Sequence, residues 1–265
     1  MNKTNYHTHT YRCKHALGSD EDYVKQALTA GFTIWGFSDH TPWPLHPIET
    51  SYYRMETEEL PGYLKSINNL KVKYQNQIKI YIGLEAEYFP DRLDWLKKLK
   101  EQYLDYLVFG NHYHHFTNLY HYYGQYDAPK AQLIDDYLSD TYDGLSSGLY
   151  DIYGHPDLFL ANYQTPDKSA LAALAKITEY SRQFNIPLEY NLAGLSIYRN
   201  YPSEQLFRLA AKNDAPVIVN GDYHNPQAIN DKGLYLAKRQ MLEEWGCRVV
   251  ETIPLDDKEK GSRKP

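Results

Sequence analysis

Short apolar or β-branched runs alternate with helix-like stretches along nearly the whole 265-residue chain. The strand-like runs are residues 6–8, 34–38, 78–84, 106–109, 150–153, 188–190 and 217–219. The helix-like stretches are residues 20–30, 56–74, 92–100, 131–145, 169–184, 204–212 and 228–245. Strands that alternate with helices form parallel sheets covered by those helices. The alternation therefore predicts seven βα units, with residues 248–252 as a candidate extra strand.

Histidines and carboxylates stand at the carboxyl ends of these runs, or just beyond them. His7-Thr8-His9 lies in the first run, and Asp222-Tyr223-His224 follows the last. The segments between them are Ser38-Asp39-His40, Gly83-Leu84-Glu85, Gly110-Asn111-His112 and Gly154-His155-Pro156-Asp157. In a βα barrel the carboxyl ends of the strands carry the active site. Six segments directed at one centre favour a closed barrel over an open sheet.

The residue types in these segments predict a metal site. Residues i and i+2 of a strand point to the same face, so each His-x-His or Asp-x-His pair delivers two side chains together. One such pair is weak grounds for a metal site, and the agreement of six segments carries the prediction. Neutral imidazole and carboxylate suit Zn, Mn and Fe, and Cys13 supplies the only nearby thiol. We therefore expect a polynuclear metal centre and a hydrolase.

Composition bounds the remaining function classes. The net charge of −6 argues against a nucleic-acid partner, because phosphate backbones are bound by clustered Lys and Arg. No apolar stretch approaches 20 residues, so no membrane partner is expected. Two cysteines are too few for a disulfide framework and predict a cytoplasmic protein. We expect one domain over residues 1–255, followed by a charged tail at 256–265, and find no signal for an oligomeric state.

The motifs resemble those of the PHP (polymerase and histidinol phosphatase) superfamily over nearly the whole chain. The matching stretches are His7-Thr8-His9 with His15 six residues on, residues 37–42, Gly83-Leu84-Glu85, Gly110-Asn111-His112, Gly154-His155-Pro156 and residues 221–224. Residues 154–158 and 188–195, with Tyr201-Pro202-Ser203, look most like the monofunctional histidinol-phosphate phosphatases. The resemblance implies a distorted (β/α)7 TIM-like barrel, three divalent metal ions, and hydrolysis of L-histidinol phosphate in histidine biosynthesis.

The resemblance also implies how the ligands divide among three ions. The first ion would be held by His7, His9, Glu85 and Asp222. The second would share Glu85 and add His112 and His155, and the third would take His15, His40 and His224. His114 is an open alternative to His112, because strand alternation aims both to the same side.

Metal ions lower the pKa of a bound water, which makes a nucleophile available at neutral pH. We expect a hydroxide bridging the first two ions to attack phosphorus while the third ion holds a non-bridging oxygen. Asp222 is the expected catalytic residue, since it can take up a proton as the hydroxide is used. Asp39 has two open interpretations, as a group that orients a metal-bound imidazole or as a partner of the loop backbone.

Two further residues are candidates for binding the substrate. Arg199 follows a strand-end segment, and its guanidinium fork matches phosphate geometry, with a surface ion pair as the alternative. Relatives often carry a basic residue after Gly-His-Pro-Asp-Leu, where this chain continues with residues 159–161, Phe-Leu-Ala. His46 on the Pro-rich loop is a substitute for that residue, an ordinary loop histidine being the simpler reading.

Three other functions compete with this interpretation. One is a PHP phosphoesterase that acts on nucleotides or other small phosphomonoesters. Another is an amidohydrolase-like barrel, which normally needs a strand-end Lys between two metals, where this chain has Glu85. The third is a metal-stabilised binding domain without catalytic activity, which would be expected to lose ligands, yet each motif here keeps its residue.

Overall fold

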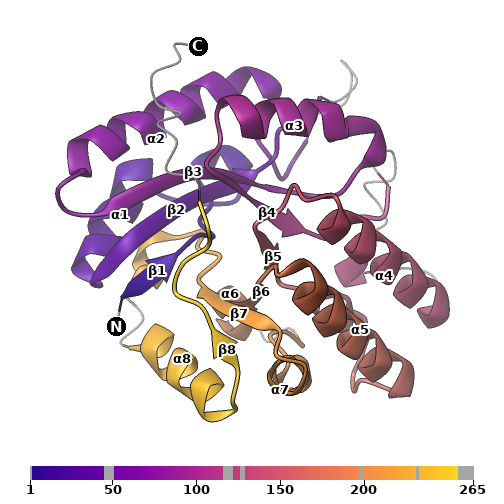
Figure 1. Ribbon diagram of the computed structural model, residues 1–265. Helices are drawn as coiled ribbons and strands as arrows, with labels where there is room; N and C mark the ends of the chain where they lie inside the picture. The colour runs from indigo at the N-terminus through magenta and orange to yellow at the C-terminus, as the bar shows by residue number, and fades with distance from the viewer. Residues whose placement is uncertain are drawn as a thin grey trace.

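A computed structural model of the chain describes residues 2–44, 51–115, 122–125, 129–196, 200–230 and 233–255. Its centre is one parallel sheet in which eight strands follow each other in chain order. The strands are β1 (Lys3–Asn5), β2 (Phe32–His40), β3 (Lys79–Ala86), β4 (Tyr106–Gly110), β5 (Ile152–Gly154), β6 (Leu188–Asn191), β7 (Pro216–Asn220) and β8 (Arg248–Val249). The sheet curls around its own axis, as Figure 1 shows.

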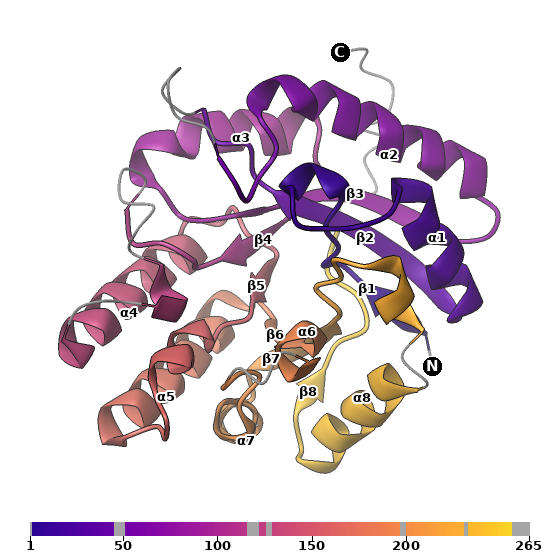
Figure 2. The ribbon, with the colours of Figure 1, turned by 180° about the vertical axis from the view of Figure 1, so that it is seen from behind.

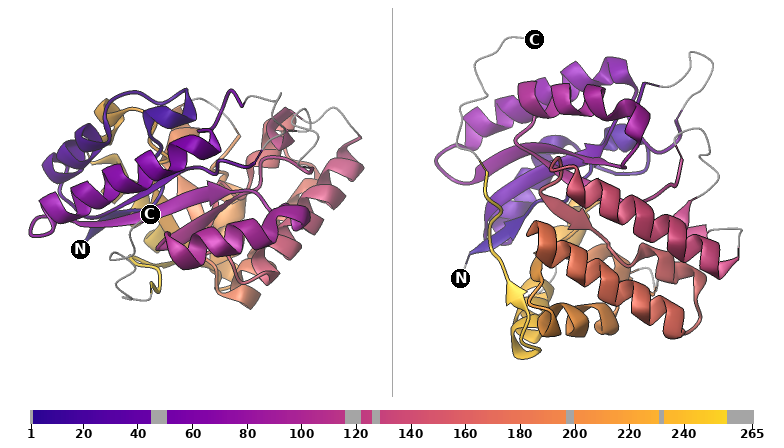
Figure 3. Two further views of the ribbon diagram at one scale, coloured as in Figure 1. Left: turned by 90° about the horizontal axis from the view of Figure 1, so that it is seen from above. Right: turned by 45° about the vertical axis from the view of Figure 1, so that its right-hand side comes forward.

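Helices cover the outside of the curled sheet (Figure 2). They are α1 (Asp20–Thr29), α2 (Leu60–Tyr74), α3 (Leu93–Gln102), α4 (Lys130–Ser146), α5 (Lys168–Phe184), α7 (Glu204–Lys212) and α8 (Leu234–Glu244), together with the single turn α6 (Leu192–Ser196). Neighbouring helices pack against each other, as α4 and α5 do in Figure 3. Within the described ranges, no helix is both long and apolar enough to cross a membrane.

The barrel closes where the segments after β1 and β7 meet. Thr8 and Tyr223 form a parallel bridge, and the His9 amide donates to the Tyr223 carbonyl at 3.0 Å. At the amino ends of these strands β8 lies against β7, and the Thr4 hydroxyl donates to the Glu251 carbonyl at 2.6 Å. The predicted TIM-like barrel of seven βα units is therefore confirmed, with β8 as the extra strand.

The amino-terminal half of the barrel interior is apolar. Its members are Tyr6, Tyr106, Val108, Ile152, Ile218 and Ile253. The Tyr106 side chain extends across the barrel, and its hydroxyl is within hydrogen-bond distance of the Tyr6 carbonyl at 2.7 Å and the Phe37 carbonyl at 3.0 Å. A side chain at Gly83 would meet the Tyr106 ring at 2.6 Å, so the absence of a Cβ there makes room for the ring. This layer fills the barrel beneath its carboxyl end.

The first strand and the last helix differ from the sequence prediction in ways that the contacts explain. The first strand is Lys3–Asn5 rather than residues 6–8, because side chains replace backbone partners there: Asn220 Oδ1 accepts from the Tyr6 amide at 2.8 Å. The last helix, predicted over 228–245, is divided into a 3-10 turn at Pro226–Ile229 and the helix α8. α8 begins after Gly233, whose backbone is left-handed with φ of 93°. The predicted tail at 256–265 lies outside the described residues.

Candidate metal centre

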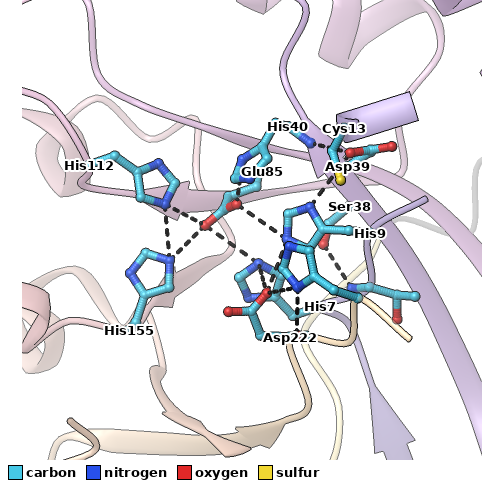
Figure 4. Close-up of polar contacts among 12 residues, drawn as sticks. His7, His9, Cys13, Ser38, Asp39, His40, Glu85, His112, His155 and Asp222 are labelled. Carbon is cyan, nitrogen blue, oxygen red and sulfur yellow. Dashed lines mark hydrogen bonds and ion pairs between the residues drawn. The ribbon is translucent and has the colours of Figure 1, made fainter. Parts of the chain in front are cut away.

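The nine predicted ligands lie together at the carboxyl end of the barrel. Glu85, at the end of β3, occupies the middle of the group (Figure 4). Its Oε1 lies 2.8 Å from His155 Nε2 and 3.2 Å from His112 Nε2. Its Oε2 lies 2.9 Å from His40 Nδ1. One buried carboxylate thus contacts imidazoles that come from β2, β5 and the end of β4.

The two ends of the chain contribute the second group. His9 Nε2 lies 3.1 Å from Asp222 Oδ1, and His7 Nε2 lies 3.5 Å from the same oxygen. Both histidines are fully buried and flank Thr8 at the barrel closure. Asp222 has a left-handed backbone with φ of 51°, so residues 222–224 form a turn rather than the extended pair that the spacing predicted. This turn still directs Asp222 and His224 toward the group.

The third group is the outermost. The His15 ring lies 4.7 Å from the His224 ring and 5.5 Å from the His40 ring, measured between centroids. The His9 ring stacks on His224 at 4.0 Å and therefore links this group to the buried one. His15 is exposed, while His40 and His224 are half-buried, so this part of the centre faces solvent.

Several donor atoms of the centre are buried and make no hydrogen bond. In the part of the chain that the structure describes, they are His7 Nε2, both ring nitrogens of His9, Glu85 Oε2, Asp222 Oδ1 and His224 Nε2. Buried polar atoms without partners are rare, because each costs the full desolvation penalty. Imidazole nitrogens and carboxylate oxygens within 4.8 Å of one another are a donor set that divalent metal ions bind. The residues present therefore fit a metal centre.

The charges of the group favour cation binding. Burial opposes ionisation of Glu85, but His112, His7 and His40 outweigh it and hold its pKa well below the ordinary value. Burial, reinforced by His9, lowers the pKa of His40 to about 3. Burial also disfavours protonated His112, yet Glu85 raises its pKa to about 9. Burial likewise opposes protonation of His7 and His9, yet nearby carboxylates hold the pKa of both well above the ordinary value. Neutral imidazoles bind metal, so protons on these histidines compete with it and binding should tighten as pH rises.

His112 and His114 occupy different surroundings. His112 Nε2 contacts Glu85 and lies 3.2 Å from His155 Nε2. His114 Nδ1 instead lies 3.0 Å from Asp140 Oδ2, on α4 and outside the nine-residue group. Backbone alternation after β4 does not persist as far as His114, because His112 follows the last residue of that strand, Gly110.

Buried carboxylates that the sequence analysis did not assign lie behind the histidines. Glu87 Oε1 lies 3.1 Å from His112 Nδ1, and Arg54 pairs with the same carboxylate at 2.9 Å. The spacing could have suggested Glu87, which lies two residues after Glu85 and directly after the end of β3. Asp39 bonds the loop backbone, since its Oδ2 accepts from the Thr10 amide at 3.2 Å, whereas its Oδ1 lies 3.5 Å from His9 Nδ1 without a hydrogen bond.

A cavity of about 850 Å³ opens above the centre. Its walls include ligands from all three groups, and the tyrosines Tyr53, Tyr113, Tyr122 and Tyr201 line it further out. This volume is in the range of small-molecule sites. The predicted substrate-binding residues His46 and Arg199 lie outside the described residues.

Comparisons with known proteins agree with this geometry. Over 250 residues the chain is 29% identical to a Deinococcus radiodurans protein named "Probable histidinol-phosphatase", covering 92% of this chain and 94% of that one. A Schizosaccharomyces pombe protein of the same name is 28% identical over 253 residues, covering 84% and 81%. The structure of a histidinol phosphate phosphatase from Lactococcus lactis, complexed with zinc, L-histidinol and phosphate, has a TM-score of 0.74 at 17% identity, covering 97% and 99%.

The family model described as PHP domain matches residues 5–193. The matched stretch runs from the segment before His7 through β6, and so contains seven of the nine clustered side chains. The remaining two, Asp222 and His224, follow β7 and join the same group. The protein therefore belongs to the PHP domain family.

Proposed function

We propose that the protein hydrolyses L-histidinol phosphate to L-histidinol and inorganic phosphate with the help of divalent metal ions. The observation that carries this proposal is the group of nine histidine and carboxylate side chains, several of whose buried polar atoms make no hydrogen bond. The similarity to the Deinococcus relative over 92% of the chain supports the choice of substrate. A biosynthetic role in making histidine follows from that substrate, as does a cytoplasmic location.

The division of ligands that we propose uses three ions. Glu85 bridges the first set, His7, His9 and Asp222, and the second set, His112 and His155. His15, His40 and His224 form the third, on the solvent side. Bound Zn, Mn or Fe would activate water and neutralise phosphoryl oxygens, which is the chemistry that a phosphate monoester requires.

Asp222 is suited to accept the proton that the attacking water loses. Its Oδ2 accepts a hydrogen bond from Asn191 Nδ2 at 3.0 Å, while its Oδ1 has no hydrogen bond. The anchored oxygen fixes the orientation of the carboxylate, and the other faces the centre. The reaction forms a bond from water oxygen to phosphorus and breaks the ester bond to the alcohol, which then takes up a proton.

The test is phosphate release by metal-reconstituted protein from L-histidinol phosphate, beside nucleoside monophosphates, phosphotyrosine and sugar phosphates. We expect a strong preference for L-histidinol phosphate, measured as kcat/KM. Asp222→Asn should lower that value by about 10³-fold or more, since loss of a supporting group alone costs ~10–100-fold. Arg199→Ala should raise KM if Arg199 binds the phosphate as the sequence predicts.

Each other result has a definite meaning. Equal or better turnover of the other esters would overturn the substrate assignment and favour a PHP phosphoesterase of different specificity. No turnover of any ester by the metal-loaded protein would overturn the phosphatase assignment itself. Full activity of Asp222→Asn would remove Asp222 from the reaction.

A further inference from the structure

Glu189 on β6 is a fully buried carboxylate that lies behind the proposed metal ligands rather than among them. Its Oε1 lies 2.8 Å from His7 Nδ1. Its Oε2 accepts from the His155 backbone amide at 2.9 Å and from Asn191 Nδ2 at 2.8 Å. Both oxygens therefore have partners, and two of those partners belong to ligand residues from opposite sides of the barrel.

Asn191 extends these contacts to a third ligand. It lies two residues after Glu189, on the same face of β6, and it also approaches Asp222 Oδ2 at 3.0 Å. The Glu189 carboxylate thus contacts His7 and His155 directly, and the side-chain amide of Asn191 links it to Asp222. His155 has φ of 30°, which is uncommon for a residue with a side chain, and the bond from its amide to Glu189 holds that conformation.

The contact with His7 selects one form of the imidazole. A carboxylate accepts hydrogen bonds, so Nδ1 carries a proton, and in the neutral ring, which is the form that binds metal, Nε2 has the free lone pair. That Nε2 atom makes no hydrogen bond and lies 3.4 Å from Glu85 Oε1 and 3.5 Å from Asp222 Oδ1. This lone pair therefore points between the two carboxylates, where the ion of the first set would lie.

Glu87 occupies a comparable position behind His112 but differs in its charge balance. Arg54 donates to both oxygens of Glu87, at 2.9 and 3.1 Å, and Trp43 Nε1 adds a bond at 2.7 Å. Within the described ranges Glu189 forms no ion pair with Lys or Arg, and its close side-chain contact with a basic residue is the one with His7 Nδ1. The negative charge of Glu87 is balanced by Arg54, whereas that of Glu189 is directed at the metal centre.

From these contacts we propose that Glu189 is a positioning residue for the metal centre. It holds His7 as the Nδ1–H tautomer, fixes the backbone of His155, and makes the affinity for the inner ions depend on its charge. Carboxylates that bond a ligating imidazole orient it and raise its basicity. This inference rests on the metal centre of the proposed function, and not on which phosphate ester is hydrolysed.

The first test needs no variant. In zinc-loaded wild-type protein, ¹⁵N NMR of the histidine side chains, with His7 assigned through His7→Gln, should show His7 protonated at Nδ1 and metal-bound at Nε2. The His7 Nδ1 proton should be protected from exchange with solvent, because Glu189 is buried. Zinc bound at Nδ1, or a proton at Nε2, would overturn the proposal.

The second test compares Glu189→Gln with its matched control Glu87→Gln. Affinity for Zn²⁺, measured by competition with a chromogenic chelator, should fall by about 10–100-fold in Glu189→Gln. The fall should be at least several-fold smaller in Glu87→Gln, whose charge Arg54 balances. Excess metal should restore part of kcat in Glu189→Gln and leave KM within about twofold of wild type. Wild-type affinity in Glu189→Gln, or an equal fall in Glu87→Gln, would contradict the proposal.

Two controls separate the role of Glu189 from effects on folding and from the identity of the substrate. Far-UV circular dichroism of the metal-free variants shows whether each folds, and if Glu189→Gln does not fold, the tautomer of His7 in wild type decides the matter. Chelator competition requires no substrate. A fall in zinc affinity together with no turnover of L-histidinol phosphate by wild type would keep the role of Glu189 and overturn the proposed function instead.

Discussion

The two ends of the barrel interior differ in whether their buried polar atoms have hydrogen-bond partners. At the amino end, Tyr6, Tyr106 and Ile218 pack in an apolar layer, and the Tyr106 hydroxyl is satisfied by backbone carbonyls. At the carboxyl end, His7, His9 and Asp222 are buried with donor or acceptor atoms that make no hydrogen bond. The first arrangement stabilises the fold, whereas the second costs stability until a ligand satisfies those atoms. The polar atoms available to a ligand are therefore concentrated in one half of the interior.

The largest effect should separate two histidines that are two residues apart. His112→Gln removes a side chain that contacts Glu85 and His155, so zinc affinity and kcat/KM should fall by about 100-fold or more. His114→Gln alters contacts with α4 and with neighbouring aromatic rings, none of which belongs to the nine-residue group, so both values should stay within about twofold of wild type. Metal content after dialysis and steady-state kinetics are the measurements. A loss of zinc affinity in His114→Gln well beyond twofold would show that His114 belongs to the metal centre.

A substitution in the apolar amino-terminal half of the barrel should change stability but not metal binding or catalysis. Tyr106→Phe removes the hydroxyl that contacts the Tyr6 and Phe37 carbonyls, so urea unfolding should show a loss of about 1–3 kcal/mol. The kcat of the metal-loaded variant should remain near wild type, since the ring still fills the layer. Loss of zinc affinity without loss of stability would mean that the two halves are not independent.

The smallest effect concerns pH and a carboxyl group outside the centre. Burial raises the pKa of Asp140 to about 6, although Tyr123 and His114 bond its carboxylate. A raised carboxyl pKa gives stability that is complete below the unfolded value, ~3.9, and lost as pH rises through the folded value. Between pH 4 and 7 the free energy of unfolding should therefore decline by on the order of 1–3 kcal/mol more in wild type than in Asp140→Asn. Parallel pH profiles for the two proteins would contradict this.

The barrel and the meeting of the ligands were predictable because strand ends are visible in the sequence. Glu85 and His40 end extended runs, and parallel strands bring such ends to one side of a sheet. The turn at Asp222 was not predictable, because an Asp-x-His spacing suits an extended strand as well as the left-handed backbone that occurs there. The side-chain bond from Asn220 that shortens β1 joins residues far apart in the chain, which no local pattern records.

The roles of Glu189 and Glu87 could not be predicted from the sequence for a different reason. Glu189 lies in β6 and Glu87 just after β3, where sequence alone does not separate a ligand from a residue that orients one. Only their partners make the distinction: Glu189 bonds His7, and Glu87 bonds both His112 and Arg54. Residue type at strand ends thus identified the centre, whereas the network behind it required the packed fold.

If the nine clustered side chains at the carboxyl end of the barrel form a metal centre, divalent ions must bind among them. The most direct measurement is anomalous-scattering crystallography of the zinc-loaded protein, combined with elemental analysis of the same preparation. We expect three zinc ions per chain, with Glu85 shared by two of them and His15, His40 and His224 around the third. Zinc bound elsewhere, or its absence from the group around Glu85, would contradict the account.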